Sequence, residues 1–409
     1  MTPKQASVLQ PNANASSSYA ASVGLLILGI ILVAANLRAP ITAVGPIIGE
    51  IRGSIGLSNT MAGFLTTLPL LAFALLSPFA PSLAARFGTE TTLFAGMVVL
   101  TVGIVIRSLP GAAALFAGTA ILGLAIAACN VLVPSLLKRD FPHKIGLMTG
   151  IYSVSMNLCG AIASGVSMPL TRKLSLGWGG ALGCWAILSC IAAVVWLPLL
   201  RLQRKQGNPT AQSKKGNPRL WRSPLAWTVT IYMGLQSLMF YVIVAWIPEI
   251  LLQYGLSAEF AGWMLSLMQF VLLAVSFVVP LIAARLSSQR GLVAIAAGCF
   301  AAGVIGLLSG NMSLAVLWFA LLGMGGGGSF SLAMMFIVLR SRDAQQSASL
   351  SGMSQSAGYL LAAAGPTLFG LLHDVTESWT IPLLLLVAVS GLLLIFGFIA
   401  GRKGYVTGS

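Results

Sequence analysis

Pro81-Ser-Leu-Ala-Ala-Arg86-Phe-Gly88 returns later in the chain as Pro280-Leu-Ile-Ala-Ala-Arg285-Leu-Ser287, and this repeated stretch decides the fold. Further identities recur at the same offset, and two later glycine pairs continue the repeat with a drift of a few residues. One octapeptide can match by chance, but four co-registered matches predict two similar halves in a parallel repeat. The other pairs are Glu50 with Glu249, Gly56–Ser58 with Gly255–Ser257, and Ala62–Gly63 with Ala261–Gly262, followed by Gly123 with Gly323 and Gly150 with Gly352.

The composition of the 409-residue chain is that of a polytopic membrane protein. Hydrophobic residues make up 57% of it and charged residues only 8%, whereas a soluble domain carries about 25% charged residues. The formal net charge of +15 does not indicate nucleic-acid binding, because the basic residues fall in short segments between apolar runs. We therefore expect a lipid bilayer around the chain and no nucleic acid as partner.

Twelve apolar runs are long enough to cross a bilayer. Because backbone polar groups must be satisfied within lipid, and the runs are too long for barrel strands, we expect an all-α protein with 12 transmembrane helices. The first run is longer than a bilayer requires, and Pro40 and Pro46 provide places for it to bend. The predicted spans are 20–50, 59–85, 91–108, 112–137, 147–171, 179–200, 224–253, 259–285, 291–309, 313–338, 348–372 and 380–400.

The basic residues also predict the orientation. With a cytoplasmic N-terminus, eighteen of the 23 lysines and arginines fall on that side, Arg38 lies within the membrane, and four fall outside: Arg52, Arg107, Arg172 and Lys173. Both termini are therefore expected in the cytoplasm. The polar N-terminal residues are expected to be a disordered tail, and the basic, turn-rich segment in the middle of the chain predicts a flexible linker. The expected order is a tail 1–18, a six-helix half 19–200, a linker 201–223, a second half 224–400 and a tail 401–409.

The repeated stretch resembles the loop motif of the major facilitator superfamily, Gly-x-x-x-Asp-Arg-x-Gly-Arg-Arg. Arg86 and Gly88 match this motif, while Ala85 stands where the motif has its aspartate, so the carboxylate of the motif's gating pair is missing here. Arg285 occupies the repeat position of Arg86. The resemblance implies a gating role for these three residues and two six-helix halves around a central pathway.

Longer stretches narrow the resemblance to the cyanate and 2-nitroimidazole transporter family, nearest to its nitroimidazole exporter type. The resemblance implies a transporter in a bacterial inner membrane, export of the solute, and a monomer that is not an enzyme. It covers nearly the whole chain after the N-terminal tail. It is carried by Leu37-Arg38, Leu65-Thr-Thr-Leu-Pro-Leu-Leu-Ala-Phe-Ala74, Lys138-Arg-Asp-Phe-Pro-His143, Arg222-Ser-Pro-Leu-Ala-Trp227, Leu350-Ser-Gly-Met-Ser-Gln-Ser356 and Gly358-Tyr-Leu-Leu-Ala-Ala363.

Arg38 is the candidate centre of the site. It lies near the middle of the first apolar run, where a cation costs about 2.5–3.5 kcal/mol on insertion scales and usually marks a solute or ion pathway. A guanidinium in a watery cavity can bind a carboxylate, nitro or cyanate-like group. The alternative is a structural role, in which Arg38 binds backbone carbonyls exposed by Pro40. No Lys, Asp, Glu, His or other Arg is expected at its depth.

Other polar residues are expected in the middle of the spans, and each can either bind the solute or form an interhelical hydrogen bond worth about 0.6 kcal/mol. Thr42 shares a helix face with Arg38, since it follows four residues later. The repeat places Ser237 opposite Arg38. The candidate substrate-binding residues besides Arg38 are Asn36, Thr42, Asn130, Tyr152, Asn157, Gln236, Tyr241, Gln269, Gln355 and Tyr359.

These residues favour a transporter of a small, planar, anionic or weakly acidic solute, nitroimidazole-like or cyanate-like, that works by alternating access. The alternative is a multidrug exporter with broader specificity, which an uncompensated arginine disfavours for cationic compounds. No cluster typical of an enzyme, metal or cofactor site is found, and the glycine-rich run Gly323–Gly328 indicates close helix packing rather than a phosphate loop. We therefore expect neither metal nor cofactor.

Overall fold

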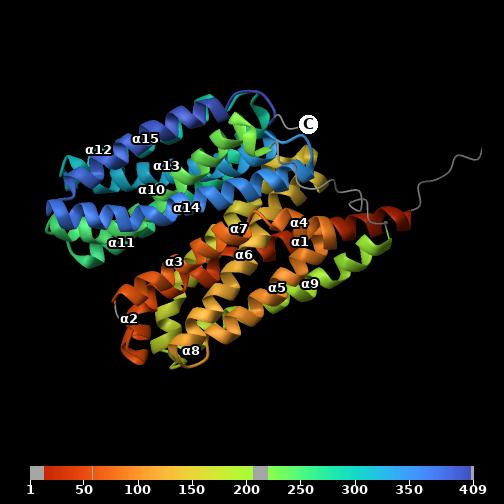
Figure 1. The fold of residues 1–409 in the computed structure, drawn as a ribbon, viewed down its shortest axis with the longest axis horizontal. Helices are drawn as coiled ribbons and strands as arrows, with labels where there is room; N and C mark the ends of the chain where they lie inside the picture. The colour runs from red at the N-terminus through yellow and green to blue at the C-terminus, as the bar shows by residue number, and fades with distance from the viewer. Residues whose placement is uncertain (1–12, 58, 206–219, 407–409) are drawn as a thin grey trace, which may run out of the picture.

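In a computed structural model, residues 13–57, 59–205 and 220–406 are described, and within these ranges the chain forms helices and no β-strand (Figure 1). The predicted tails 1–18 and 401–409 and the linker 201–223 lie partly outside the described residues. The first half contains α1 (Ala13–Thr42), α2 (Val44–Ile55), α3 (Asn59–Leu76), α4 (Ala80–Phe87), α5 (Thr89–Arg107), α6 (Ala112–Asp140), α7 (Ile145–Arg172), α8 (Gly177–Gly183) and α9 (Trp185–Lys205). The second half contains α10 (Pro224–Gln253), α11 (Ala258–Arg285), α12 (Arg290–Leu308), α13 (Ala315–Leu339), α14 (Ala344–Thr376) and α15 (Thr380–Ala400).

Each predicted span corresponds to one long helix or to two consecutive helices. Among the described residues, ten helices are long and apolar enough to cross a membrane, and the pair α3–α4, bent by 57°, adds an eleventh. The twelfth is α14, a 33-residue helix that packs along α10 but carries many serines and glutamines in its first half. The prediction of an all-α fold with twelve spans is confirmed, and α14 is the span whose polar character hides it from a hydropathy criterion.

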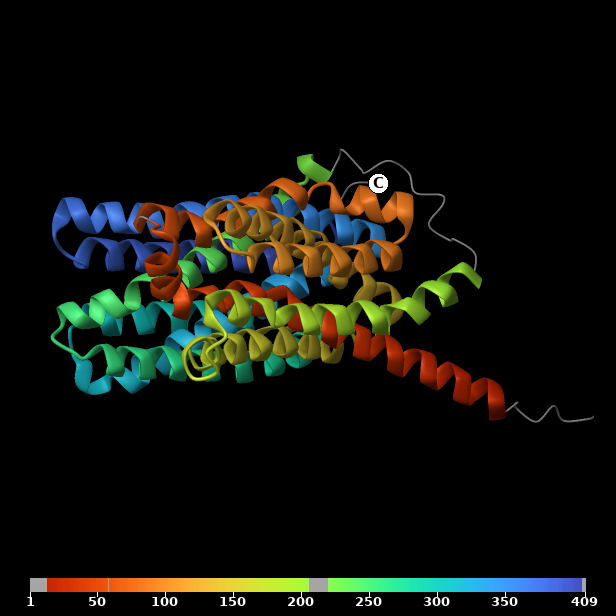
Figure 2. The ribbon, with the colours of Figure 1, turned by 90° about the horizontal axis from the view of Figure 1, so that it is seen from below.

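The two ends of the bundle differ in what they carry. We call the end where α1 begins and α15 ends the terminal face, and the opposite end the distal face (Figures 1 and 2). The turns Phe141–Lys144, Leu286–Gln289 and Arg340–Asp343 lie at the terminal face, and the turns at Gly56 and Gly255 lie at the distal face. Toward the distal face the two halves diverge, with α2 and α3 on one side and α11 and α14 on the other (Figure 1).

The sequence repeat is visible in the packing. Gly56 and Gly255 both end a distal helix in the left-handed region, at φ values of 68° and 79°. A Cβ on Gly123 of α6 would lie 3.2 Å from the Cα of Pro69 in α3, and one on Gly323 of α13 would lie 2.5 Å from the carbonyl oxygen of Met268 in α11. The corresponding helices of each half therefore approach closely at corresponding glycines.

The two halves differ in where prolines interrupt their helices. Pro78 separates α3 from α4, whereas the repeat places Phe277 at the matching position of α11, which runs unbroken. Pro46 cannot donate to the carbonyl of Thr42, and the first span breaks there between α1 and α2. Its repeat partner is Ala245, in the unbroken α10. The bend expected in the first span is therefore present.

The halves are held together from the centre of the bundle to the terminal face. The Ser356 hydroxyl on α14 donates to the carbonyl of Ala74 on α3 at 2.6 Å, and the Gln355 amide donates to the carbonyl of Asn130 on α6 at 3.0 Å. Nearer the terminal face, Lys138 Nζ donates to the carbonyl of Val338 at 2.7 Å. These bonds explain why α14 keeps a polar first half, since its side chains bind backbone groups of the other half.

Candidate functional site

A small cavity of about 30 Å³ lies between the two halves, at the level of Arg38. The first half contributes α1 and α7 to its wall, and the second half contributes α10, α11, α13 and α14. The residues that line it are Arg38, Asn157, Gln236, Ser237, Phe240, Tyr241, Leu272, Gly326, Phe330 and Tyr359.

Arg38 is held by an amide and not by a carboxylate. Its Nη1 donates to Asn157 Oδ1 at 3.0 Å, and Asn157 in turn donates from Nδ2 to the carbonyl of Ser153 at 2.9 Å, which fixes the orientation of the amide. The stem of Arg38 passes Gly160, where a Cβ would lie 3.0 Å from the arginine Cγ. None of the ion pairs in the described ranges includes Arg38. Its positive charge therefore has no protein counter-charge.

Aromatic rings of the second half face the guanidinium. The Cζ of Arg38 lies 4.8 Å from the ring centre of Phe240 and 6.0 Å from that of Phe330. Both distances are within the range of cation–π attraction, which favours a cation over the face of a ring. Tyr241 and Tyr359 complete an aromatic wall around the cavity. The site can thus offer charge, planar stacking surfaces and amide or hydroxyl groups to one small solute.

Five of the eleven candidate substrate-binding residues meet at this cavity: Arg38, Asn157, Gln236, Tyr241 and Tyr359. Gln236 is buried and donates from Nε2 to Ser237 Oγ at 2.6 Å. The roles of these residues in binding a solute stay predictions.

The other six candidates lie outside the cavity lining. Asn130 accepts a hydrogen bond from the Tyr152 hydroxyl at 3.1 Å, and Thr42 donates to the carbonyl of Gly160 at 2.8 Å. Asn36 is fully buried and donates to the carbonyls of Leu32 and Leu188, so it faces α9. Gln355 bonds across the halves, as described above, and Gln269 is half-buried on α11. The role of all six residues in substrate binding also stays a prediction. The hydrogen bonds of Asn130, Tyr152, Thr42 and Asn36 join neighbouring helices or lie within one helix.

Sequence reasoning did not identify two of the aromatic residues as site residues. Phe240 and Phe330 are ordinary apolar residues within apolar spans, and only their placement beside Arg38 distinguishes them. The sequence did point to the position of Ser237, because the repeat places it opposite Arg38. A search that had included aromatic residues one turn from that position would have found Phe240.

Another arginine of the first half binds the backbone near the end of α1. Arg107, at the end of α5, is fully buried and donates from Nη1 to the carbonyl of Pro40 at 2.7 Å. Arg107 was counted with the basic residues on the side opposite the termini, and its burial at the end of α5 was not expected. Burial follows from close packing on α6, since a Cβ on Gly118 would lie 2.6 Å from the Cα of Arg107. Arg107 thus supports the break between α1 and α2, while Arg38 is left to face the cavity.

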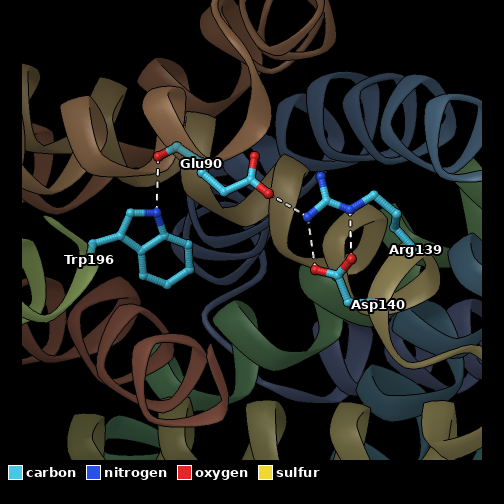
Figure 3. A network of polar contacts seen from close by, with 4 residues as sticks. All are labelled: Glu90, Arg139, Asp140 and Trp196. Carbon is cyan, nitrogen blue, oxygen red and sulfur yellow. Dashed lines mark hydrogen bonds and ion pairs between the residues drawn. The ribbon is translucent and has the colours of Figure 1, made fainter. Parts of the chain in front are cut away.

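The residues expected to form a gate lie at the terminal face. Arg86 is exposed and contacts the ring of Phe87 at 5.2 Å, and Gly88 ends α4 with φ at 89°. The motif's aspartate is absent, and the nearest carboxylate in sequence after Gly88 is Glu90. Glu90 accepts a hydrogen bond from Arg139, which also binds Asp140 at 2.7 and 2.8 Å (Figure 3). This network stays within the first half, and the gating role of Arg86, Gly88 and Arg285 stays a prediction.

Comparison with known proteins agrees with this architecture. The sequence pattern of the Major Facilitator Superfamily matches residues 26–366. A solved structure of the proton:xylose symporter XylE, bound to 6-bromo-6-deoxy-D-glucose, superposes with a TM-score of 0.73 at 13% identity, over 95% of this chain and 98% of that one. At that identity the superposition supports the fold alone.

Three curated proteins are similar over most of their length. The uncharacterized transporter YycB of Bacillus subtilis (strain 168) is 49% identical over 93% of this chain and 94% of its own. The 2-nitroimidazole transporter of Escherichia coli (strain K12) is 43% identical over 92% of this chain and 95% of its own. The cyanate transport protein CynX of the same strain is 26% identical over 87% of this chain and 91% of its own.

Two six-helix halves with a polar cavity between them, together with these relatives, define a multi-pass membrane transporter. The chain belongs to the Major Facilitator Superfamily, and within it is homologous to the 2-nitroimidazole and cyanate transporters.

Proposed function

We propose that this protein exports a small, planar, anionic or weakly acidic solute of the 2-nitroimidazole or cyanate kind by alternating access. The observation that carries the proposal is the guanidinium of Arg38 at the cavity between the halves, which has an amide partner and no carboxylate partner in the described ranges. An uncompensated cation in a low-dielectric site favours an anion and opposes a second cation.

The lining favours a planar solute. The guanidinium already lies over the rings of Phe240 and Phe330, and a flat anion beside Arg38 can contact the same rings. The hydroxyl groups of Tyr241 and Tyr359 and the amide of Gln236 are within the same lining and can orient nitro, cyanate or ring-nitrogen groups. The names of two relatives refer to solutes of this size, namely 2-nitroimidazole and cyanate.

The size of the cavity supports alternating access. A volume of about 30 Å³ is the share of one liquid water molecule, and small-molecule sites measure about 300–1,000 Å³. A solute therefore enters only if the halves move apart. The contacts of α14 with α3 and α6 would break on one side of the membrane while the opposite side closes.

For orientation we propose the bacterial inner membrane, with the terminal face in the cytoplasm, on the strength of the lysine and arginine distribution. The export direction follows from the family resemblance. We further propose a monomer that performs no chemistry on its solute and uses no nucleic acid partner, metal or cofactor. The alternative, a multidrug exporter of cationic compounds, is disfavoured because such a compound would meet Arg38 without a counter-charge.

A flux assay tests the proposal. The purified full chain is reconstituted in proteoliposomes, and efflux of 2-nitroimidazole, cyanate and a planar cation of similar size is measured at two pH values. We expect saturable flux of the first two solutes and none of the cation above that of empty liposomes. Flux of the cation alone would establish the multidrug alternative and overturn the anion proposal.

A further inference from the structure

A second, larger cavity lies at the terminal face, apart from Arg38. Its volume is about 600 Å³, within the usual range for small-molecule sites. The first half lines it with the end of α6, the 3₁₀ turn Pro142–Lys144 and the start of α7. The second half lines it with the ends of α11 and α13, the start of α14, and Tyr405. The cavity is therefore shared between the two halves.

Basic side chains outnumber acidic ones in this lining. They are Lys138, His143, Lys144, Arg285 and Arg342, against a single acidic residue, Asp343. Asp343 caps α14, where its Oδ1 accepts the backbone N–H of Gln346 at 2.7 Å, and Lys138 is bound to carbonyls of the other half. Lys144, Arg285 and Arg342 are exposed and form no ion pair in the ranges that the structure covers.

Membrane orientation alone does not account for this arrangement. The positive-inside rule requires basic residues at the cytoplasmic face, but it does not require them to converge from both halves on one hollow. Like charges around a shared cavity repel one another, and they focus a positive potential that attracts an anion. Arginine forks and lysine ammonium groups together are the usual ligands of phosphate groups.

We propose that the terminal-face cavity binds a phosphate-bearing anion, held between Lys144 of the first half and Arg285 and Arg342 of the second. The phosphate can belong to a soluble anion or to the headgroup of an anionic lipid. Because both halves contact the ligand only while the terminal face is closed, binding stabilises this conformation over one in which the halves separate there. A bound anion therefore slows the transport cycle. This last consequence rests on the proposed alternating access, whereas the binding itself does not.

Thermal unfolding of the purified full chain tests the binding. In detergent, sodium pyrophosphate is titrated against sodium chloride of equal ionic strength, and in parallel the chain is placed in nanodiscs of phosphatidylcholine with or without phosphatidylglycerol. We expect at least one of the two phosphate sources to raise the melting temperature in a saturable manner. In the double variant Lys144→Gln/Arg342→Gln, the apparent affinity for that source falls about tenfold or more, because two charged ligands are lost.

Two controls separate this site from other effects. Lys403→Gln removes one positive charge from an exposed position near the terminal face that does not line the cavity, and it keeps the full response. Arg38→Ala also keeps the response, so that a failure of the proposed solute site does not affect this result. A response to pyrophosphate identifies a soluble ligand, and a response to phosphatidylglycerol alone identifies the lipid headgroup. The proposal is overturned if neither source shifts the melting temperature, or if the double variant responds like the wild type.

Discussion

The guanidinium of Arg38 combines three properties. It lies at the contact between the two halves, it has an amide and aromatic rings as partners, and it lacks a carboxylate partner in the described ranges. Cation–π contacts are weaker than an ion pair, so an incoming anion can replace them. Arg38 is thus held in place without being neutralised.

Replacing Arg38 with alanine should abolish solute flux. Truncating one partner of a buried charge pair costs about 2–5 kcal/mol, which corresponds to a loss of roughly 30-fold or more in the affinity for the anion. Arg38→Lys should restore flux only in part, because an ammonium keeps the charge but loses the planar fork. The measurement is efflux from proteoliposomes, with size-exclusion chromatography to show that each variant is folded. Wild-type flux by Arg38→Ala would remove the basis of the proposed site.

A substitution at Asn157, the hydrogen-bond partner of Arg38, tests the role of the arginine charge more directly. Asn157→Asp places a carboxylate at the position that now lies 3.0 Å from Arg38 Nη1, and an ion pair forms in the empty site. The half-saturation concentration for the solute should rise by about tenfold or more, since the solute must displace the new carboxylate. Asn157→Ala leaves the charge of Arg38 free, so its half-saturation concentration for the solute should stay within about threefold of the wild-type value. Equal effects of the two variants would mean that Asn157 acts by packing and that the arginine charge is not the attraction.

At the scale of helices, prolines and polar side chains act together. A proline within a helix frees the carbonyl four residues before it. Pro78 frees that of Ala74, which accepts from Ser356, and Pro134 frees that of Asn130, which accepts from Gln355. Within the second half, Pro280 frees the carbonyl of Ser276, which accepts from Ser331. The first two bonds join the halves, and the third joins two helices of the same half.

This difference yields a matched pair of variants. Gln355→Leu/Ser356→Ala leaves two freed carbonyls without donors and should weaken the closed terminal face by about 1–3 kcal/mol. Ser331→Ala removes a bond of the same kind within one half and should not affect closure. Hydrogen–deuterium exchange is the measurement: amides near Ser77 and at the start of α14 should exchange faster in the double variant alone. Equal exchange in both variants would show that these bonds do not hold the halves together.

The sequence predicted the elements well and their interruptions only in part. Apolar runs and the repeat around Pro81 and Pro280 predicted the twelve spans and the two halves. Pro78 was not singled out, although it explains why α3 breaks where α11 continues past Phe277. The polar first half of α14 becomes intelligible only when its partners are known, because the donors of α14 and the carbonyls of α3 and α6 lie far apart in the sequence.

The candidate site was predicted to the extent that it depends on polar residues in apolar runs. Arg38 was identified because a charge in a span is costly, and Asn157 and Tyr359 were identified as polar groups near mid-span. The burial of Arg107 could not be predicted, since it depends on Gly118 admitting the backbone of α5 at close range. Phe240 could not be predicted for a similar reason. An aromatic residue in an apolar span looks like any other core residue in the sequence, and only the structure shows that Phe240 lies beside the guanidinium of Arg38.

At the scale of the whole molecule, charge is separated by depth. All eight acidic residues lie near the ends of helices or in the turns at the two faces, and Arg38 lies between them at the central cavity. A carboxylate that gains and loses a proton during the cycle is the common device of proton coupling, and no such group lines the cavity. The acidic residues are Glu50, Glu90, Asp140, Glu249, Glu259, Asp343, Asp374 and Glu377.

Transport should therefore follow the ionisation of the solute and not that of the protein. For the anion of a strong acid, which stays ionised, we expect a flux that changes less than about twofold between about pH 5.5 and pH 8, because no Asp, Glu or His lines the cavity that contains Arg38. For a weak acid, flux should follow the ionised fraction of the solute. A pH-sensitive dye inside the proteoliposomes measures proton movement in the same experiment, and Arg38→Ala liposomes give the background. Proton uptake in a fixed ratio to a permanently ionised solute would contradict the prediction and would require a titrating group elsewhere on the pathway.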